Sequence, residues 1–83
     1  MRVTIRYFAA IREHIGLSTE EVQTTAADLN ALRAELIARG DPYAVALEDG
    51  KAIRMALNQQ VCDGTTRLLA DAEVAFFPPV TGG

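Results

Sequence analysis

The part of this sequence best suited to chemistry is its last two residues, Gly82 and Gly83. Glycine has no Cβ, so such an end can thread a narrow slot and present its main-chain carboxylate to the active site of another protein. An α-carboxylate is ionised at neutral pH and can attack the α-phosphate of ATP. The resulting acyl-adenylate can pass to a thiol, an amine or a sulfide. The sequence therefore predicts that the Gly83 carboxylate is the reactive group.

The residues before the two glycines are suited to carry that group away from the body of the protein. Residues 74–83 contain no charged side chain, and Pro78 and Pro79 hold the chain extended. At about 3.3–3.6 Å per residue, residues 80–83 reach roughly 14 Å beyond the body. A frayed terminus is the alternative, but disordered ends are usually polar and charged. We therefore expect a domain over residues 1–77 and a flexible, extended tail over residues 78–83.

Reactive side chains are scarce, with one histidine (His14), one cysteine (Cys62) and one lysine (Lys51) among 83 residues. His14 has no Cys, Asp or Ser partner at a catalytic spacing, and no neighbour in the sequence would activate the Cys62 thiol. We interpret His14 as a surface residue, Cys62 as a partly buried small side chain and Lys51 as a solvated charge in a turn. The acidic residues have no metal-binding spacing, so no metal site is expected. A chain of this size encloses only one modest core, which argues against an enzyme that acts alone.

The charge and composition exclude several classes of protein. Eight basic and eleven acidic residues give a net charge of −3, whereas a nucleic-acid-binding surface needs clustered basic residues. No apolar run approaches the length of about 18 residues that spans a membrane. A single cysteine requires no oxidising compartment. These features predict a single cytoplasmic domain that binds neither nucleic acid nor membrane.

The first half of the chain predicts two strands and two helical segments. Residues 2–8 alternate as a strand, with Val3, Ile5 and Tyr7 on one face and the arginines and Phe8 on the other, solvent-facing side. Residues 9–15 fit a short helical turn that Gly16 ends, and residues 18–24 a weak second strand. The clearest helix starts after Asp28, a good N-cap, and ends near Gly40 and Pro42.

The second half predicts further strands and an exposed aromatic residue. Residues 53–58 alternate again, Asp63 and Gly64 mark a turn, and residues 73–77 form the last strand. In that strand Phe77 shares its face with Glu73, so Phe76 is expected in the core and Phe77 outside it. Strands interrupted by one covering helix predict an α+β fold.

The ending of the chain, from Glu73 to Gly83, resembles the C-terminus of the molybdopterin synthase small-subunit family, ubiquitin-like β-grasp sulfur carriers. Residues 7–13, 46–51 and 57–59 extend the resemblance over nearly the whole chain. It departs at residues 69–74, where this chain lacks the family's glycine and is one residue shorter. The resemblance implies a β-grasp fold with a mixed sheet of four to five strands and one main helix packed across it.

The resemblance also implies a mechanism and partners. A ubiquitin-activating-type adenylyltransferase would use ATP to adenylate Gly83, and a sulfur donor would convert it to a thiocarboxylate. The tail would then enter the active site of the synthase large subunit and deliver sulfur to cyclic pyranopterin monophosphate (precursor Z). The complex would be a heterotetramer with two of each subunit. This chain would be a sulfur-donating subunit that binds no cofactor itself.

By position, the family's exposed apolar contact surface corresponds to Phe8, Val61 and Phe77. Alternation already places Phe8 and Phe77 outside the core, whereas Val61 comes from the resemblance alone. The same surface would serve both partners. Together with the tail, the residues expected to bind them are Phe8, Val61, Phe77, Pro78, Pro79, Val80, Thr81 and Gly82.

Two alternative functions share the chemistry as far as the adenylate. The chain could carry sulfur for another pathway, such as thiazole synthesis or tRNA thiolation. It could also be a protein modifier joined to target lysines through Gly83. The sequence leaves open the sulfur donor, dual use of one carrier and the oligomeric state of the free chain.

Overall fold

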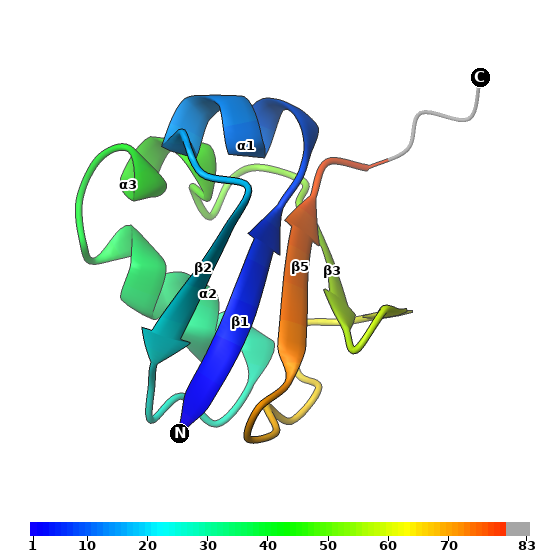
Figure 1. Ribbon diagram of the computed structural model, residues 1–83. Coiled ribbons are helices and arrows are strands. Elements are labelled where there is room, and N and C mark those ends of the chain that lie inside the picture. The colour runs from blue at the N-terminus through cyan, green and yellow to red at the C-terminus, as the bar shows by residue number, and fades with distance from the viewer. Residues whose placement is uncertain (80–83) are drawn as a thin grey trace.

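A mixed five-stranded sheet forms the centre of the fold, and helices cover one of its faces (Figure 1). The structure is a computed structural model that describes residues 1–79. The elements are β1 (Arg2–Tyr7), α1 (Ala9–Ile15), β2 (Thr19–Gln23), α2 (Leu29–Ile37), α3 (Tyr43–Ala46), β3 (Arg54–Leu57), β4 (Gln60–Cys62) and β5 (Glu73–Phe77). The strand order is β2-β1-β5-β3-β4; β1 and β5 are parallel and the other neighbours antiparallel. The predicted α+β class and mixed sheet are confirmed.

The hydrophobic core lies between the helices and the face of the sheet that they cover. Val3, Ile5 and Tyr7 of β1 are at most 1% exposed, as their alternation predicts. On the parallel neighbour β5, Val74 and Phe76 are fully buried beside them. The Tyr7 and Phe76 rings stack with centroids 6.4 Å apart. The first and last strands therefore meet at the middle of the sheet and share one core.

The helix α2 packs across this core with one apolar stripe. Leu29, Leu32 and Leu36 lie at helical spacing and are all fully buried. The Asp28 carboxylate accepts a hydrogen bond of 2.8 Å from the Ala31 N–H, which is the predicted N-cap. The helix ends at Ile37, three residues before Gly40, near which its end was expected, and Gly40 adopts a left-handed φ of 87°.

The predicted helical turn over residues 9–15 is α1, and Gly16 ends it with a φ of 88°. The weak second strand is β2, paired antiparallel to β1 with Val3 opposite Val22. Two short elements were not predicted. One is α3, four residues long, and the other is β4, three residues long, too short for a period to be visible.

None of the helices within residues 1–79 has the length and apolarity to cross a bilayer.

Candidate functional site

Phe8, directly after β1, and Phe77, the last residue of β5, lie at the same end of the sheet because these two central strands run in the same direction (Figure 1). Tyr7 is in register with Phe76, so the next residue of each strand, Phe8 and Phe77, falls on the opposite, uncovered face. The Phe8 N–H donates a hydrogen bond of 3.2 Å to the Phe76 carbonyl oxygen. Residues 69 positions apart in the sequence thus form one end of a surface.

Small side chains form the floor of this surface. Ala75 of β5 pairs with Ala56 of β3, and Ala56 pairs with Val61 of β4. Directly paired residues share a face, so the row continues from the two alanines to Val61 at the edge of the sheet. Because methyl groups stand between larger side chains, the sheet is hollowed here.

The hollow is an open apolar groove of about 580 Å³. It brings together four of the predicted contact residues, Phe8, Val61, Phe77 and Pro78. Its other lining residues are Arg6, Ala9, Ala56, Gln59, Glu73 and Ala75. Ala56 and Ala75 were not predicted as site residues, although the alternation of their strands places both on this face.

The exposure of the predicted contact residues differs. Val61 is 60% and Phe8 38% exposed, and Pro79 is exposed. Phe77, which alternation predicts to be exposed, is half-buried, as is Pro78. Phe77 loses exposure because Arg54 of β3 lies directly opposite it and the groove walls enclose it. Large apolar side chains gathered around a hollow on a small domain are typical of a protein-binding surface.

One charged side chain stands at the groove on β1. The Arg6 guanidinium lies over the Phe8 ring, 5.4 Å from its centroid, and 4.0 Å from the Glu73 carboxylate. Its side chain is 47% exposed. The sequence analysis placed Arg6 on the solvent face but gave it no role.

The turn after β3 positions the Val61 side of the groove. The Asn58 N–H donates to the Glu73 carbonyl oxygen at 2.8 Å, and the Glu73 N–H donates to Asn58 Oδ1 at 2.9 Å. This reciprocal pair fixes the Asn58–Gln59 turn against β5. Both turn residues have positive φ, 49° and 69°, as a two-residue hairpin turn requires. Val61 therefore projects from a short but anchored hairpin.

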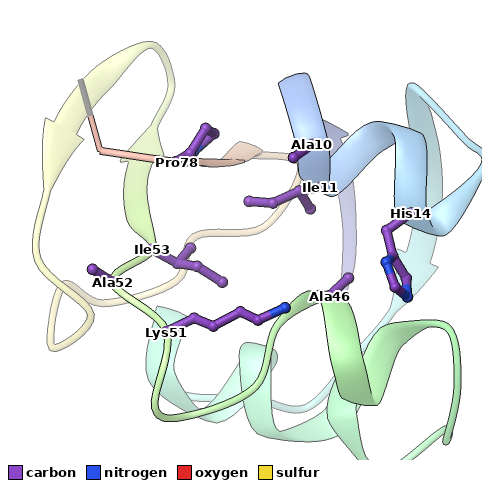
Figure 2. A pocket seen from close by; sticks show the side chains of 8 residues that line it. All are labelled: Ala10, Ile11, His14, Ala46, Lys51, Ala52, Ile53 and Pro78. Carbon is purple, nitrogen blue, oxygen red and sulfur yellow. The ribbon is translucent and has the colours of Figure 1, made fainter. Parts of the chain in front are cut away.

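A second, smaller pocket of about 300 Å³ lies on the other side of Pro78 (Figure 2). Ile11 of α1 and Ile53 of the segment before β3 face each other across it, and Lys51 runs along its margin. The Lys51 ammonium donates to the Val45 carbonyl oxygen at 2.7 Å, so it holds the chain together here. His14 is exposed at the rim. Pro78, the only described residue shared by the two hollows, separates them at the root of the tail.

The remaining reactive side chains form no catalytic cluster in the described part of the chain. Cys62 is half-buried and packs against the core, as its interpretation as a small apolar side chain implies. Among residues 1–79, no group of three His, Cys, Asp or Glu side chains is placed to hold a metal ion.

A cluster of polar side chains lies away from the groove, at the β2 edge. Glu20 accepts hydrogen bonds from the hydroxyls of Tyr7, at 3.0 Å, and Tyr43, at 2.7 Å, and from Arg39 at 2.9 Å. Partial burial opposes ionisation of Glu20, but these three donors outweigh it and hold its pKa below the usual 4.5. Burial and the neighbouring carboxylate raise the pKa of both tyrosines. The cluster ties α3 to the sheet and is structural.

Three of the predicted contact residues, Val80, Thr81 and Gly82, and the predicted reactive group, Gly83, lie outside the described residues. The last described residue is Pro79, which follows directly on the groove-lining Pro78.

Fold and surface together define a small α+β domain with an open apolar groove beside the start of its C-terminal segment. The ThiS family model matches residues 5–83. The chain is 42% identical over 81 residues to the molybdopterin synthase sulfur carrier subunit of Escherichia coli, covering 98% of this chain and 99% of that protein. This chain therefore belongs to the ThiS family, and the resemblance inferred from its sequence is confirmed.

Solved structures share the fold. SAMP1 from Haloferax volcanii superposes with a TM-score of 0.76 at 25% identity, covering 100% of both chains. The complex of subunits 1 and 2 of molybdopterin-converting factor from Helicobacter pylori contains a chain with a TM-score of 0.66 and 28% identity, again over 100% of both chains. The predicted β-grasp fold is confirmed by these neighbours.

Proposed function

We propose that this chain is the sulfur-carrier subunit of a molybdopterin synthase. The observation that supports the proposal most strongly is its likeness over almost its full length to the E. coli sulfur carrier subunit, in a chain whose family match extends to Gly83. The apolar groove at the root of the tail supports it independently, because a carrier must dock on a partner while its end reaches that partner's active site.

The proposed chemistry takes place at the Gly83 carboxylate. One carboxylate oxygen attacks the α-phosphate of ATP on an adenylyltransferase, and pyrophosphate leaves. A sulfide-level nucleophile from a sulfur donor then forms a C–S bond at the acyl carbon, and AMP leaves. The thiocarboxylate sulfur then forms a C–S bond to cyclic pyranopterin monophosphate in the large subunit, and water cleaves the acyl C–S bond so that Gly83 returns to a carboxylate. Binding supplies orientation and a high effective concentration for that transfer.

In this proposal the groove docks on the synthase large subunit, and two copies of each subunit form the complex. The Helicobacter pylori complex of subunits 1 and 2 supports a partner of this kind. Phe8, Val61 and Phe77 supply the apolar contacts, and Pro78 and Pro79 direct residues 80–83 into the partner. We also infer a cytoplasmic location, where ATP is available to the activating enzyme.

Intact mass spectrometry tests the carrier step. The protein is incubated with its activating enzyme, ATP and a sulfur donor, and oxygen-to-sulfur exchange at the C-terminus is expected. Deletion of Gly83 should abolish the exchange and leave the thermal unfolding midpoint unchanged. An unchanged mass for the full chain, or sulfur transfer by the deletion variant, contradicts the proposal.

A second candidate is a protein modifier joined to lysines through Gly83, and the fold shared with SAMP1 is compatible with it. The two functions differ after the adenylate, where a lysine amine rather than a sulfur nucleophile attacks. Isopeptide-linked adducts in cell extracts, lost on deletion of Gly83, would support the modifier. Sulfur transfer to the pterin precursor with the large subunit would support the carrier.

A further inference from the structure

The groove has a charged residue at its β1 side whose hydrogen-bonding capacity is largely unused. A guanidinium carries five N–H donors. Within residues 1–79, Arg6 donates none in a hydrogen bond, and its one ion-pair partner is Glu73 at the limiting distance of 4.0 Å. By comparison, Arg33 donates to three carbonyl oxygens and Arg39 to Glu20. Arg6 therefore keeps most of its donors available to a partner.

The position of Arg6 is fixed even though its donors are unused. Its Cα is paired with Ala75 on one side and Thr19 on the other, within the sheet. The guanidinium stacks over the Phe8 ring at 5.4 Å, a favourable cation–π distance. The stacking places the guanidinium at the margin of the groove, where a bound partner can reach it.

The surrounding charge also favours an acidic partner at this point. The chain as a whole has a net charge of −3. On the uncovered face, however, the strands place Arg2, Arg6 and Arg54 against only Glu21 and Glu73. Arg2 is paired with Glu21 at 3.3 Å, far along β1 from the groove. Among the strand residues of this face the basic side chains therefore outnumber the acidic ones by one, on a protein whose overall charge is negative.

We propose that Arg6 is a specificity residue of the groove. The partner subunit that binds in the groove presents a carboxylate to Arg6. Beside this carboxylate, an apolar side chain of the partner fills the hollow over Ala56 and Ala75. The inference rests on the proposed function, since it concerns the partner that takes the tail. A bidentate Arg–carboxylate contact at the margin would set the orientation of docking, whereas the apolar floor supplies affinity.

The test compares Arg6→Gln with Arg2→Gln, which removes the same charge from the same strand and face outside the groove. Affinity of the full chain for the purified large subunit is measured by calorimetry at low and at high salt. Arg6→Gln should weaken binding at least about tenfold at low salt, near the lower end of the range for close interfacial charge pairs, and less at high salt. Arg2→Gln should leave affinity within about twofold. Arg6→Lys should retain the salt dependence but bind more weakly than the wild type, because an ammonium cannot form the bidentate contact.

Equal binding by Arg6→Gln and the wild type, or tighter binding by the variant, overturns the inference. So does an equal loss in Arg6→Gln and Arg2→Gln, which would indicate a general charge effect. Thermal unfolding of each variant verifies that the groove remains folded. If the wild type itself fails to bind the large subunit, the proposed function fails; if it binds and Arg6 has no effect, only this inference fails.

Discussion

Val61 is an exposed apolar residue that the proposed function makes a partner contact and that contributes little to stability. It is 60% exposed on the three-residue strand β4, at the far side of the groove from Phe8. A side chain that stays in water when the protein folds adds little to the free energy of unfolding, but it is buried when a partner covers the groove.

Val61→Asp should therefore change the free energy of unfolding by no more than about 0.5 kcal/mol. Affinity for the large subunit should fall at least about tenfold, because a carboxylate would be buried against the apolar groove. Leu69→Asp is the matched control, since Leu69 is 50% exposed and lies outside the groove. Equal affinities of the two variants would show that the groove is not the contact surface.

Asp71 explains how the chain closes the turn at which it lacks the family's glycine. The Ala72 N–H donates to the Leu69 carbonyl oxygen at 3.2 Å, and Asp71 at the third position has a φ of 62°. That left-handed conformation suits glycine, and aspartate tolerates it better than most residues. The Asp71 N–H also donates to the Arg2 carbonyl oxygen at 2.8 Å, which secures the turn to β1.

The stability of variants at this position should follow the order Gly, Asp, Val. Asp71→Gly should raise the free energy of unfolding by up to about 0.5 kcal/mol, since relief of strain exceeds the extra entropy of the unfolded chain. Asp71→Val should lower it by about 1–2 kcal/mol, because a β-branched side chain is poorly accommodated at positive φ. Urea unfolding measures both, and a valine variant as stable as the wild type would contradict the strain argument.

At the scale of elements, Glu20 is the residue through which β1, β2 and α3 are held together. Its carboxylate accepts from Tyr7 of β1 and Tyr43 of α3. The pKa of Glu20 is lower in the folded than in the unfolded chain, so its ionised form stabilises the fold. That contribution is present above the ordinary pKa of 4.5 and is lost as the pH falls through the lower, folded value.

Glu20→Gln should consequently destabilise the protein by about 1–2 kcal/mol at pH 7, because the tyrosine hydroxyls lose a charged acceptor. The difference between variant and wild type should shrink as the pH is lowered below 4.5. Thermal unfolding midpoints measured from pH 3 to pH 7 test this, with Glu21→Gln as control, since Glu21 makes one exposed ion pair. A constant difference across that range would contradict the assignment.

The elements that could be predicted from the sequence are those with a clear periodicity of apolar residues or with a residue that marks where the element begins or ends. Residues 9–15 and 73–77 coincide with α1 and β5, and Asp28 caps α2. The short elements α3 and β4 could not be predicted, because four and three residues are too few to show a periodicity of apolar side chains.

The groove could be predicted only in part. Alternation places Phe8 and Phe77 on one face, but the pairing of Ala75 with Ala56 depends on a register between strands distant in sequence. The same register half-buries Phe77, which the pattern within one strand cannot show.

At the scale of the whole molecule, the core and the proposed reactive end are separate. Every residue of the core cluster lies between Val3 and Phe76, and the groove ends at Pro78. A chain ending at Pro79 should therefore unfold within about 2 °C of the full chain, because it loses no core residue. It should accept no sulfur. A chain ending at Ala72 lacks β5 and should not fold, which circular dichroism would reveal. Folding of the shorter chain would contradict the central role of β5.

The parallel pairing of β1 with β5 has a consequence for synthesis of the protein. The first strand leaves the ribosome early but has no central neighbour until residues 73–77 follow it. Nascent or prematurely terminated chains consequently remain without a completed sheet, and Phe8 has no Phe77 beside it. The groove is complete only once β5 has been made, because Ala75 and Phe77 belong to it. In the proposed function, a partner that recognises the assembled groove would therefore bind only chains in which β5 has been synthesised, and shorter fragments would not be activated.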